Sequence, residues 1–305
     1  MKKVNVIVLT GFLISLLFSC GGSGNRVANF NFPESDSIPI NEAEKLSQEA
    51  IEDIVQNISS PVEMASLLQA LEVPFFTEYL ASTREADGLS TNFQKALQLG
   101  VYGADLGYLN IYEKTGTAID NLATINKLAD ALRVGQFFDF ETLKRLAVNK
   151  TNIDSLLFMS VHSFNEIDEY LRENNRGYLS SLMITGVWIE AQYLACMVLK
   201  DFPHRELKDR IGEQKIVIND LLLLLRPYMN SDDEFSDLYS DLERIKTSFR
   251  PVEITYIPGD PETIERNGRL VVIQNETSVI MIDDDDLSDV IKITEEIRNK
   301  VIANQ

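Results

Sequence analysis

The sequence predicts a mainly α-helical protein, an antiparallel helical bundle with a small C-terminal antiparallel β element and a terminal helix. Apolar residues recur at intervals of three and four between about 41 and 250, and short connections separate these periodic stretches. After Pro251, β-branched runs alternate with turn residues. With 305 residues, 45% of them hydrophobic, the chain is long enough to bury a sizeable core. We expect the bundle at 41–250 and, packed on it, the β element with its helix at 251–305.

The first twenty residues resemble the export signal of a bacterial lipoprotein. Lys2 and Lys3 precede an apolar run over 4–18, which is too short to cross a membrane. The run ends in "LFSC" at 17–20, which is similar to a lipobox. The resemblance implies cleavage before Cys20 and a lipid on its thiol, with acyl chains such as palmitate. We therefore expect a signal peptide at 1–19 and attachment to a membrane through Cys20.

Residues 20–40 are predicted to be the lipidated cysteine followed by a flexible tether, because glycine, serine and proline occur there without an apolar period. The second cysteine of the chain is Cys196, in an apolar helical stretch, where it is expected to be a small buried hydrophobe. With Cys20 lipidated, no intramolecular disulfide is available, so the fold must depend on its core.

The helical stretches follow in order along the chain. The first, over 41–58, repeats apolar residues at i, i+4 spacing, and Pro61 suits the first turn of the next helix. Gly135 is expected to cap the C-terminus of one helix, and Asp139 the N-terminus of another. Further helices are predicted at 90–111, 117–135, 139–149, 152–175, 179–200, 205–228 and 233–249.

Three β-branched runs follow Pro251, at 252–257, 269–274 and 278–282. Turn residues separate them, among them Asn267-Gly268, so they predict a two- or three-stranded antiparallel piece. A strand pair alone is marginally stable, and we expect this one to pack on the bundle. Helical spacing returns at 283–303 and predicts the terminal helix.

The stretch 179–199 is apolar enough to suggest a membrane span. Glu190 and Gln192 lie at its centre, and a charged acid there would cost about 2.5–3.5 kcal/mol on insertion scales. A helix buried inside the bundle explains the same composition without that cost. The sequence therefore favours a core helix.

The segment "GVYGADLGYLN" at 100–110 has three glycines. A phosphate-binding loop needs a strand before it and a helix start after it, whereas the preceding residues are helical. On a helix, Gly100, Gly103, Ala104 and Gly107 share one face. We expect this smooth face to let another helix approach closely.

The opposite face of that segment carries an acid and tyrosines, and "GVWIEAQYLA" at 186–195 is similar to it. Asp105 with Tyr108, and Glu190 with Tyr193, each place a phenol three residues after an acid. If the two acids face each other, one of them gains a raised pKa, or the pair binds a cation; a structural polar pair is the alternative. The candidate pocket or buried polar cluster comprises Tyr102, Asp105, Tyr108, Trp188, Glu190 and Tyr193.

No established catalytic or metal-binding pattern occurs in the sequence. The two histidines, His162 and His204, stand in no His-Glu-x-x-His motif, and no Gly-x-Ser-x-Gly elbow occurs. We assign no catalytic residue, no metal ligand and no cofactor. The acidic runs at 230–237 and 282–289 each precede a helix, where they are expected to cap it rather than bind calcium.

The formal charge of −19 argues against a nucleic-acid partner, which needs clustered lysine and arginine. Together, the lipobox, the segments at 100–114 and 186–195, and the closing "EEIRNKVI" resemble an uncharacterised family of Bacteroidetes helical lipoproteins. The resemblance implies an address in the cell envelope, in the outer membrane facing the periplasm or the surface, and no reaction.

The expected role is that of a lipid-anchored, non-catalytic binding or scaffold protein for an envelope protein or a small ligand. Two alternatives stay open: an enzyme that uses Asp105 and Glu190 as an acid pair, and a structural subunit of an envelope complex.

Overall fold

The computed structural model describes residues 38, 51, 61–148, 153–259, 262–266, 269–273 and 277–303. The predicted signal peptide, Cys20, nearly all of the tether and most of the predicted helix at 41–58 lie outside these residues. Ile51, the one described position of that helix, is helical and buried.

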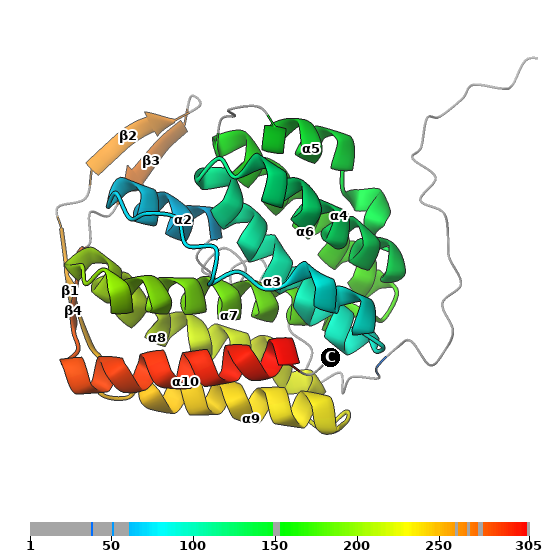
Figure 1. Ribbon diagram of the computed structural model, residues 1–305. Helices are drawn as coiled ribbons and strands as arrows, with labels where there is room; N and C mark the ends of the chain where they lie inside the picture. Colours follow the sequence, from blue (N-terminus) through cyan, green and yellow to red (C-terminus); the bar gives the residue numbers. More distant parts are fainter. Residues whose placement is uncertain are drawn as a thin grey trace, which may run out of the picture. The chain divides into compact units, whose positions relative to one another are not determined.

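The predicted fold class is confirmed: the chain is mainly helical, with a small antiparallel β element before a terminal helix (Figure 1). The first described helices are α2 (Pro61–Ala70), α3 (Asn92–Ile111), α4 (Thr115–Ala131), α5 (Phe140–Val148) and α6 (Ile153–Glu173). They are followed by α7 (Gly177–Asp201), α8 (Arg205–Leu225), α9 (Asp233–Ser248) and α10 (Asp284–Ala303). Short 3₁₀ helices are η3 (Thr83–Gly88), η4 (Gly135–Phe137) and η5 (Arg226–Tyr228).

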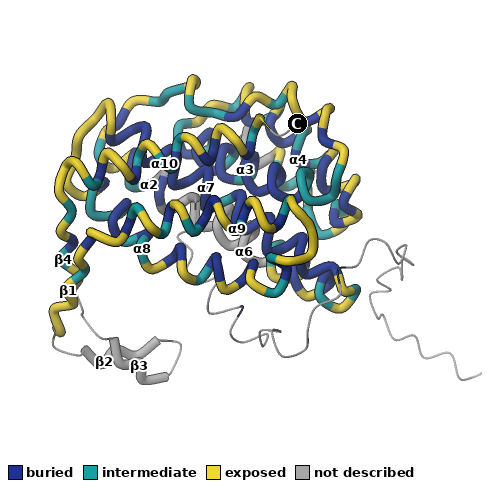
Figure 2. The backbone as a smooth tube through the Cα atoms, turned by 90° about the horizontal axis from the view of Figure 1, so that it is seen from below, coloured by how far each residue is buried: buried dark blue, intermediate teal, exposed yellow. Residues whose placement is uncertain are grey.

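Helix α7 lies at the centre of the bundle and contacts α3, α6, α8 and α10. It appears as a dark blue rod in Figure 2, because nearly every residue along it is buried. Among the described residues, α7 is the one helix whose length and composition would suit a membrane span, and 94% of that stretch is buried inside the protein. A core helix, as the sequence favours, accounts for its apolar character.

Helices α3 and α7 make the most extensive contact among the described elements, and glycines permit it. A Cβ atom added to Gly100 would lie 2.1 Å from the carbonyl oxygen of Met183, and one added to Gly186 would lie 2.0 Å from that of Leu97. The two backbones therefore touch, as the glycine face of α3 predicts. Gly103 lies at the margin of this contact, since its Cβ would be 4.0 Å from a methyl group of Val187.

The β element consists of two antiparallel pairs, with β1 (Glu253–Ile257) against β4 (Thr277–Met281) and β2 (Glu262–Arg266) against β3 (Arg269–Ile273). The pairs are nested, so the chain runs out along β1 and β2 and returns along β3 and β4. Strand β4 packs on α8 through Ile280, whose methyl group lies against Gly212. The sequence missed β2, because "ETIER" has a single apolar residue and lacks the β-branched run that marks the other strands.

Most of the predicted caps agree with the structure. Asp139, Asp232 and Asp283 each accept a hydrogen bond from a backbone N–H three residues later, at 2.9, 2.9 and 2.8 Å. The prediction for Gly135 is wrong. Helix α4 ends earlier, and the left-handed residue that closes it is Arg133, with φ of 57°, while Gly135 begins η4.

The close contact of α3 and α7 at Gly100 and Gly186 leads to two predictions about stability. We expect Gly186→Ala to lower the free energy of unfolding by about 1–3 kcal/mol or more, because the new methyl group meets backbone atoms of α3. Gly103→Ala, whose new methyl group would be in ordinary van der Waals contact with Val187, is expected to raise it by about 0.5–1 kcal/mol. Urea unfolding followed by circular dichroism measures both; equal effects would contradict the assigned crossing point.

Candidate functional site: a buried carboxyl and arginine cluster

The α3–α7 crossing brings the two predicted acids into one buried cluster. Asp105 projects from α3 and Glu190 from α7, and both are 0% exposed. They lie close enough for the negative charge of Glu190 to act on the carboxyl of Asp105. We call Asp105, Glu190 and their cationic partner Arg298 the buried acid cluster.

Arg298 of α10 holds Glu190 through a two-pronged ion pair. Its Nε and Nη2 each donate to one carboxylate oxygen of Glu190 at 2.8 Å. Its guanidinium also stacks over the ring of Tyr193, with Cζ 4.2 Å from the ring centroid. Burial lowers the pKa of Arg298, but the charge and hydrogen bonds of Glu190 outweigh this and hold it above its usual value. Arg298 and Glu190 therefore form a charged pair inside the protein.

Asp105 differs from Glu190, because it has no bidentate cation. Its Oδ2 accepts a hydrogen bond from the backbone N–H of Ala81 at 3.0 Å, and its carboxyl lies within hydrogen-bonding reach of the carboxyl of Glu190. Burial raises the pKa of Asp105 well above its ordinary value, and the nearby charge of Glu190 raises it further. Asp105 therefore keeps its proton to a higher pH than an ordinary aspartic acid does.

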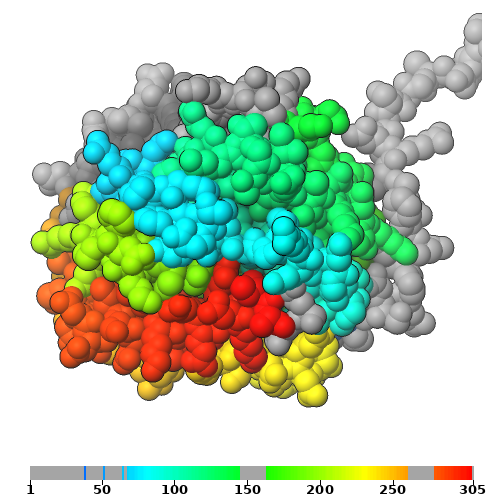
Figure 3. Space-filling view, viewed as in Figure 1, coloured from blue at the N-terminus to red at the C-terminus, as the bar shows by residue number. Residues whose placement is uncertain are grey.

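Residues 71–82, which we call the covering segment, lie over the cluster without helical or strand structure. Arg298 Nη2 donates to the carbonyl oxygen of Tyr79 at 3.0 Å, and Figure 3 shows the cyan atoms before α3 meeting the red atoms of α10. Side chains along α3 and at its C-terminal cap bond to the backbone of this segment in antiparallel order. These bonds are Tyr112 Oη to Val73 O (2.9 Å), Phe76 N to Tyr108 Oη (3.1 Å), Ala81 N to Asp105 Oδ2 (3.0 Å) and Tyr102 Oη to Ser82 O (2.9 Å).

All six residues of the predicted cluster are buried, so they do not line an open pocket. Tyr102, Asp105 and Tyr108 hold the covering segment, while Glu190 and Tyr193 contact Arg298. Trp188 points elsewhere: its Nε1 donates to Oε1 of Gln214 on α8 at 2.8 Å. The structure therefore assigns Trp188 to a separate part of the core.

Sequence reasoning missed Arg298. In the stretch "TEEIRNKVI" it stands among charged residues and resembles a surface arginine. The signal that was available is its position relative to Thr294, Ile297 and Val301, which lie on the buried face of α10 together with it. An arginine on the apolar face of an amphipathic helix predicts a buried anionic partner.

The remaining candidate groups have structural roles. His204 accepts a hydrogen bond from the N–H of Glu206 and so caps α8. His162 lies in α6, and its side chain is outside the described part. Burial raises the pKa of the Cys196 thiol to about 12, which leaves it protonated and unreactive. The described residues contain no group of three or more acidic, histidine or cysteine side chains placed to hold a metal ion.

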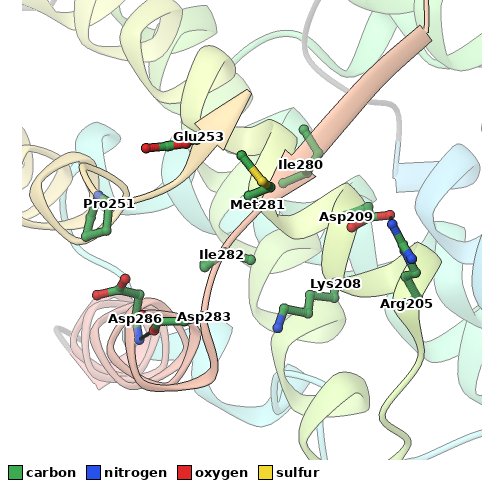
Figure 4. Close-up of a pocket in the computed structure, with 10 residues that line it drawn as sticks. All are labelled: Arg205, Lys208, Asp209, Pro251, Glu253, Ile280, Met281, Ile282, Asp283 and Asp286. Carbon is green, nitrogen blue, oxygen red and sulfur yellow. Dashed lines mark hydrogen bonds and ion pairs between the residues drawn. The ribbon is translucent and has the colours of Figure 1, made fainter. Parts of the chain in front are cut away.

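One groove of about 570 Å³ opens on the surface between the start of α8, the end of β4 and the start of α10 (Figure 4). Ile280, Met281 and Ile282 supply its apolar lining, and Asp283 and Asp286 lie on one side of it. Lys208, on the other side, forms an ion pair with Asp284 at 2.7 Å. The groove uses none of the residues of the buried acid cluster.

Comparison of the chain with protein-family models, with curated proteins and with solved structures finds no match.

The raised pKa of Asp105 predicts a specific pH dependence of stability. Between the pKa of Asp in the unfolded chain, about 3.9, and its higher value in the folded chain, folded protein holds a proton that unfolded protein has released. Stability then falls with rising pH, by up to about 1.4 kcal/mol per pH unit from this one group. Asp105→Asn keeps the acceptor for Ala81 and cannot titrate. We expect the variant to gain stability relative to the parent from pH 4 upwards, as measured by urea unfolding at several pH values; parallel curves would refute the assignment.

The buried ion pair of Arg298 with Glu190 predicts that two arginine substitutions lower the free energy of unfolding by very different amounts. Arg298→Leu leaves Glu190 buried without its cation, and we expect a loss of about 3–5 kcal/mol in the free energy of unfolding. Arg244→Leu is the control, since Arg244 is 41% exposed in its ion pair with Glu296, and a loss of about 0–1 kcal/mol is expected. Similar losses for the two variants would show that Arg298 is not a buried partner.

Proposed function

We propose that the protein is a lipid-anchored component of the bacterial cell envelope whose folded body acts as a non-catalytic binding or scaffold protein. The attachment rests on the lipobox at 17–20 and the short apolar run before it. The non-catalytic role rests on one observation above all: the acid pair available for catalysis is sealed inside the core.

Three features of the acid cluster support the non-catalytic role. Asp105 and Glu190 are both 0% exposed, whereas a general acid or base must reach the substrate directly or through one water. Both oxygens of Glu190 are occupied by Arg298. The covering segment is fastened above the cluster by bonds from α3 and α10. The rival enzyme would have to break these bonds before a substrate could enter.

The bonds made by the cluster favour a structural role instead. Together, Asp105 and Arg298 fasten an irregular segment of 71–82 to two helices that are distant in sequence. Backbone N–H and C=O groups buried without partners are costly, and these side chains supply partners. The cluster therefore organises the fold and leaves binding to the surface.

The anchoring part of the proposal is tested by Cys20→Ala. Without the thiol that receives the lipid, we expect the protein to move from the membrane fraction to the soluble fraction after cell disruption and ultracentrifugation. Cys196→Ala is the matched control, because it removes the other cysteine of the chain and leaves the lipobox intact. Retention of the Cys20→Ala variant in the membrane fraction would contradict the proposal.

A further inference from the structure

The buried acid cluster contains two carboxyl groups for one cation. Asp105 and Glu190 are 0% exposed, and Arg298 is 4% exposed. Both oxygens of Glu190 accept hydrogen bonds from Arg298, so the positive charge is matched by that carboxylate. A second ionised carboxyl would have no cation of its own among the described residues of the cluster, and an unmatched charge inside a protein is costly. The cluster is therefore electrically neutral only while one of its carboxyls carries a proton.

That proton lies between Asp105 and Glu190. The two carboxyls are within hydrogen-bonding reach of each other. Two carboxylates at this separation repel, whereas a protonated carboxyl donates a hydrogen bond to a carboxylate. Asp105 is the donor, because the bonds from Arg298 hold Glu190 in its ionised form. Burial and the charge of Glu190 raise the pKa of Asp105, which agrees with this assignment.

The other titratable groups around Asp105 keep their charge states when this proton leaves. Three phenols of α3 and α7 interact with the charge of Asp105, and burial raises the pKa of each. They belong to Tyr102, Tyr108 and Tyr193. On α10, the ion pair of Arg298 holds its pKa above the usual value. The covering segment faces Asp105 with the backbone N–H of Ala81, and its acids, Glu72 and Glu78, are exposed. A rise in pH therefore removes the shared proton before it changes the phenols or the guanidinium.

Residues 77–81, which we call the flap, are the part of the covering segment that meets the buried acid cluster. The two bonds between them are Ala81 N to Asp105 Oδ2 (3.0 Å) and Arg298 Nη2 to Tyr79 O (3.0 Å). On either side of the flap, phenols of α3 fasten the backbone at 76 and 82. Because those phenols stay neutral, the ends of the flap keep their attachments when Asp105 ionises.

Water lies directly outside the flap. Its first two residues are exposed and the next two are half-buried, and the phenol of Tyr79 donates to Asp201 near the surface. The flap has no helical or strand structure, whereas the three helices of the cluster are held by their own backbone hydrogen bonds. Outward movement of the flap is therefore the least costly way to bring water to Asp105.

We propose that the flap is pH-sensitive, closed while Asp105 and Glu190 share a proton and open once that proton has passed to solvent. In the open form water solvates the Asp105 carboxylate, and its pKa returns toward the ordinary value of about 3.9. Proton release and opening then favour each other. The equilibrium constant for opening therefore rises with pH, by up to about tenfold per pH unit, until the pH exceeds the raised pKa of the closed form. The flap is separate from the proposed binding role and does not depend on it.

Amide hydrogen exchange of the intact folded protein, resolved by NMR and corrected for the intrinsic rate at each pH, measures the opening. We expect the protection of the Ala81 amide to fall by up to about tenfold per pH unit above about pH 4. Low concentrations of urea should leave this exchange unchanged, because the flap exposes little surface when it opens. Leu238, buried in α9, is the reference for unfolding of the whole chain, and urea should accelerate its exchange.

Two carboxyl substitutions test the shared proton. Asp105→Asn keeps an acceptor for Ala81 and cannot ionise, so the pH dependence of protection should disappear. Glu190→Gln leaves Asp105 as the single carboxyl beside Arg298, which favours its ionised form, and the dependence should disappear there too. Asp209→Asn makes the same change at an acid of α8 outside the cluster, and this matched control should keep the pH dependence of the parent. Circular dichroism verifies that the variants fold.

The inference is overturned if the protection of Ala81 does not depend on pH in the parent, or if urea accelerates its exchange as it does that of Leu238. It is also overturned if Asp105→Asn keeps the dependence or Asp209→Asn removes it. A dependence that persists in folded Glu190→Gln would show that the two carboxyls share no proton, and the flap would then lack its trigger. If Glu190→Gln does not fold, the parent and Asp105→Asn decide.

Discussion

The burial of the Arg298 guanidinium, away from water, constrains much of this structure. A buried charge costs several kcal/mol unless it is paired and hydrogen-bonded. Arg298 meets that demand with Glu190, the carbonyl of Tyr79 and the ring of Tyr193. Each partner belongs to α7 or to the covering segment, so satisfying one side chain fixes where α10, α7 and residues 71–82 lie relative to one another.

The glycine crossing adds the fourth element to this arrangement. Because Gly100 and Gly186 allow the backbones of α3 and α7 to touch, Asp105 reaches the environment of Glu190. Two tyrosines of α3, Tyr102 and Tyr108, bond to the backbone of the covering segment. The segment "GVYGADLGYLN" thus has two structural uses: its glycines determine how closely the helices approach, and its polar side chains hold an irregular stretch of backbone.

The fold class was predictable because it rests on local periodicity. The apolar spacing of the helices and the β-branched runs of β1, β3 and β4 depend on nearby residues alone. Asp105 and Glu190 were also identifiable, since an acid in an otherwise apolar helix needs a partner. Arg298 and the covering segment were not, because the face of α10 that turns inward and the course of 71–82 depend on contacts between residues far apart in the chain. The end of α4 was not predictable from Gly135, because Arg133 adopts the left-handed conformation there despite its side chain.

The covering segment and strand β1 differ in how their backbone groups are hydrogen-bonded. In the covering segment, the N–H groups of Phe76 and Ala81 and the C=O group of Tyr79 are bonded to side chains of α3 and α10. Strand β1 keeps one edge without a strand partner in the described part of the chain and presents apolar side chains beside it. The polar side chains of α3 are therefore engaged by the backbone of the protein itself.

The sequence separation of the ion pair has a consequence for the order in which the protein forms. Glu190 and Arg298 are 108 positions apart, and the carbonyl of Tyr79 is 219 positions from Arg298. A ribosome therefore releases α3 and α7, with their two acids, well before Arg298, the ion-pair partner of Glu190, exists. Until then, closing the core over both carboxyls would bury an uncompensated charge. Nascent chains should consequently remain loosely packed around the α3–α7 crossing, and final consolidation should await the synthesis of α10.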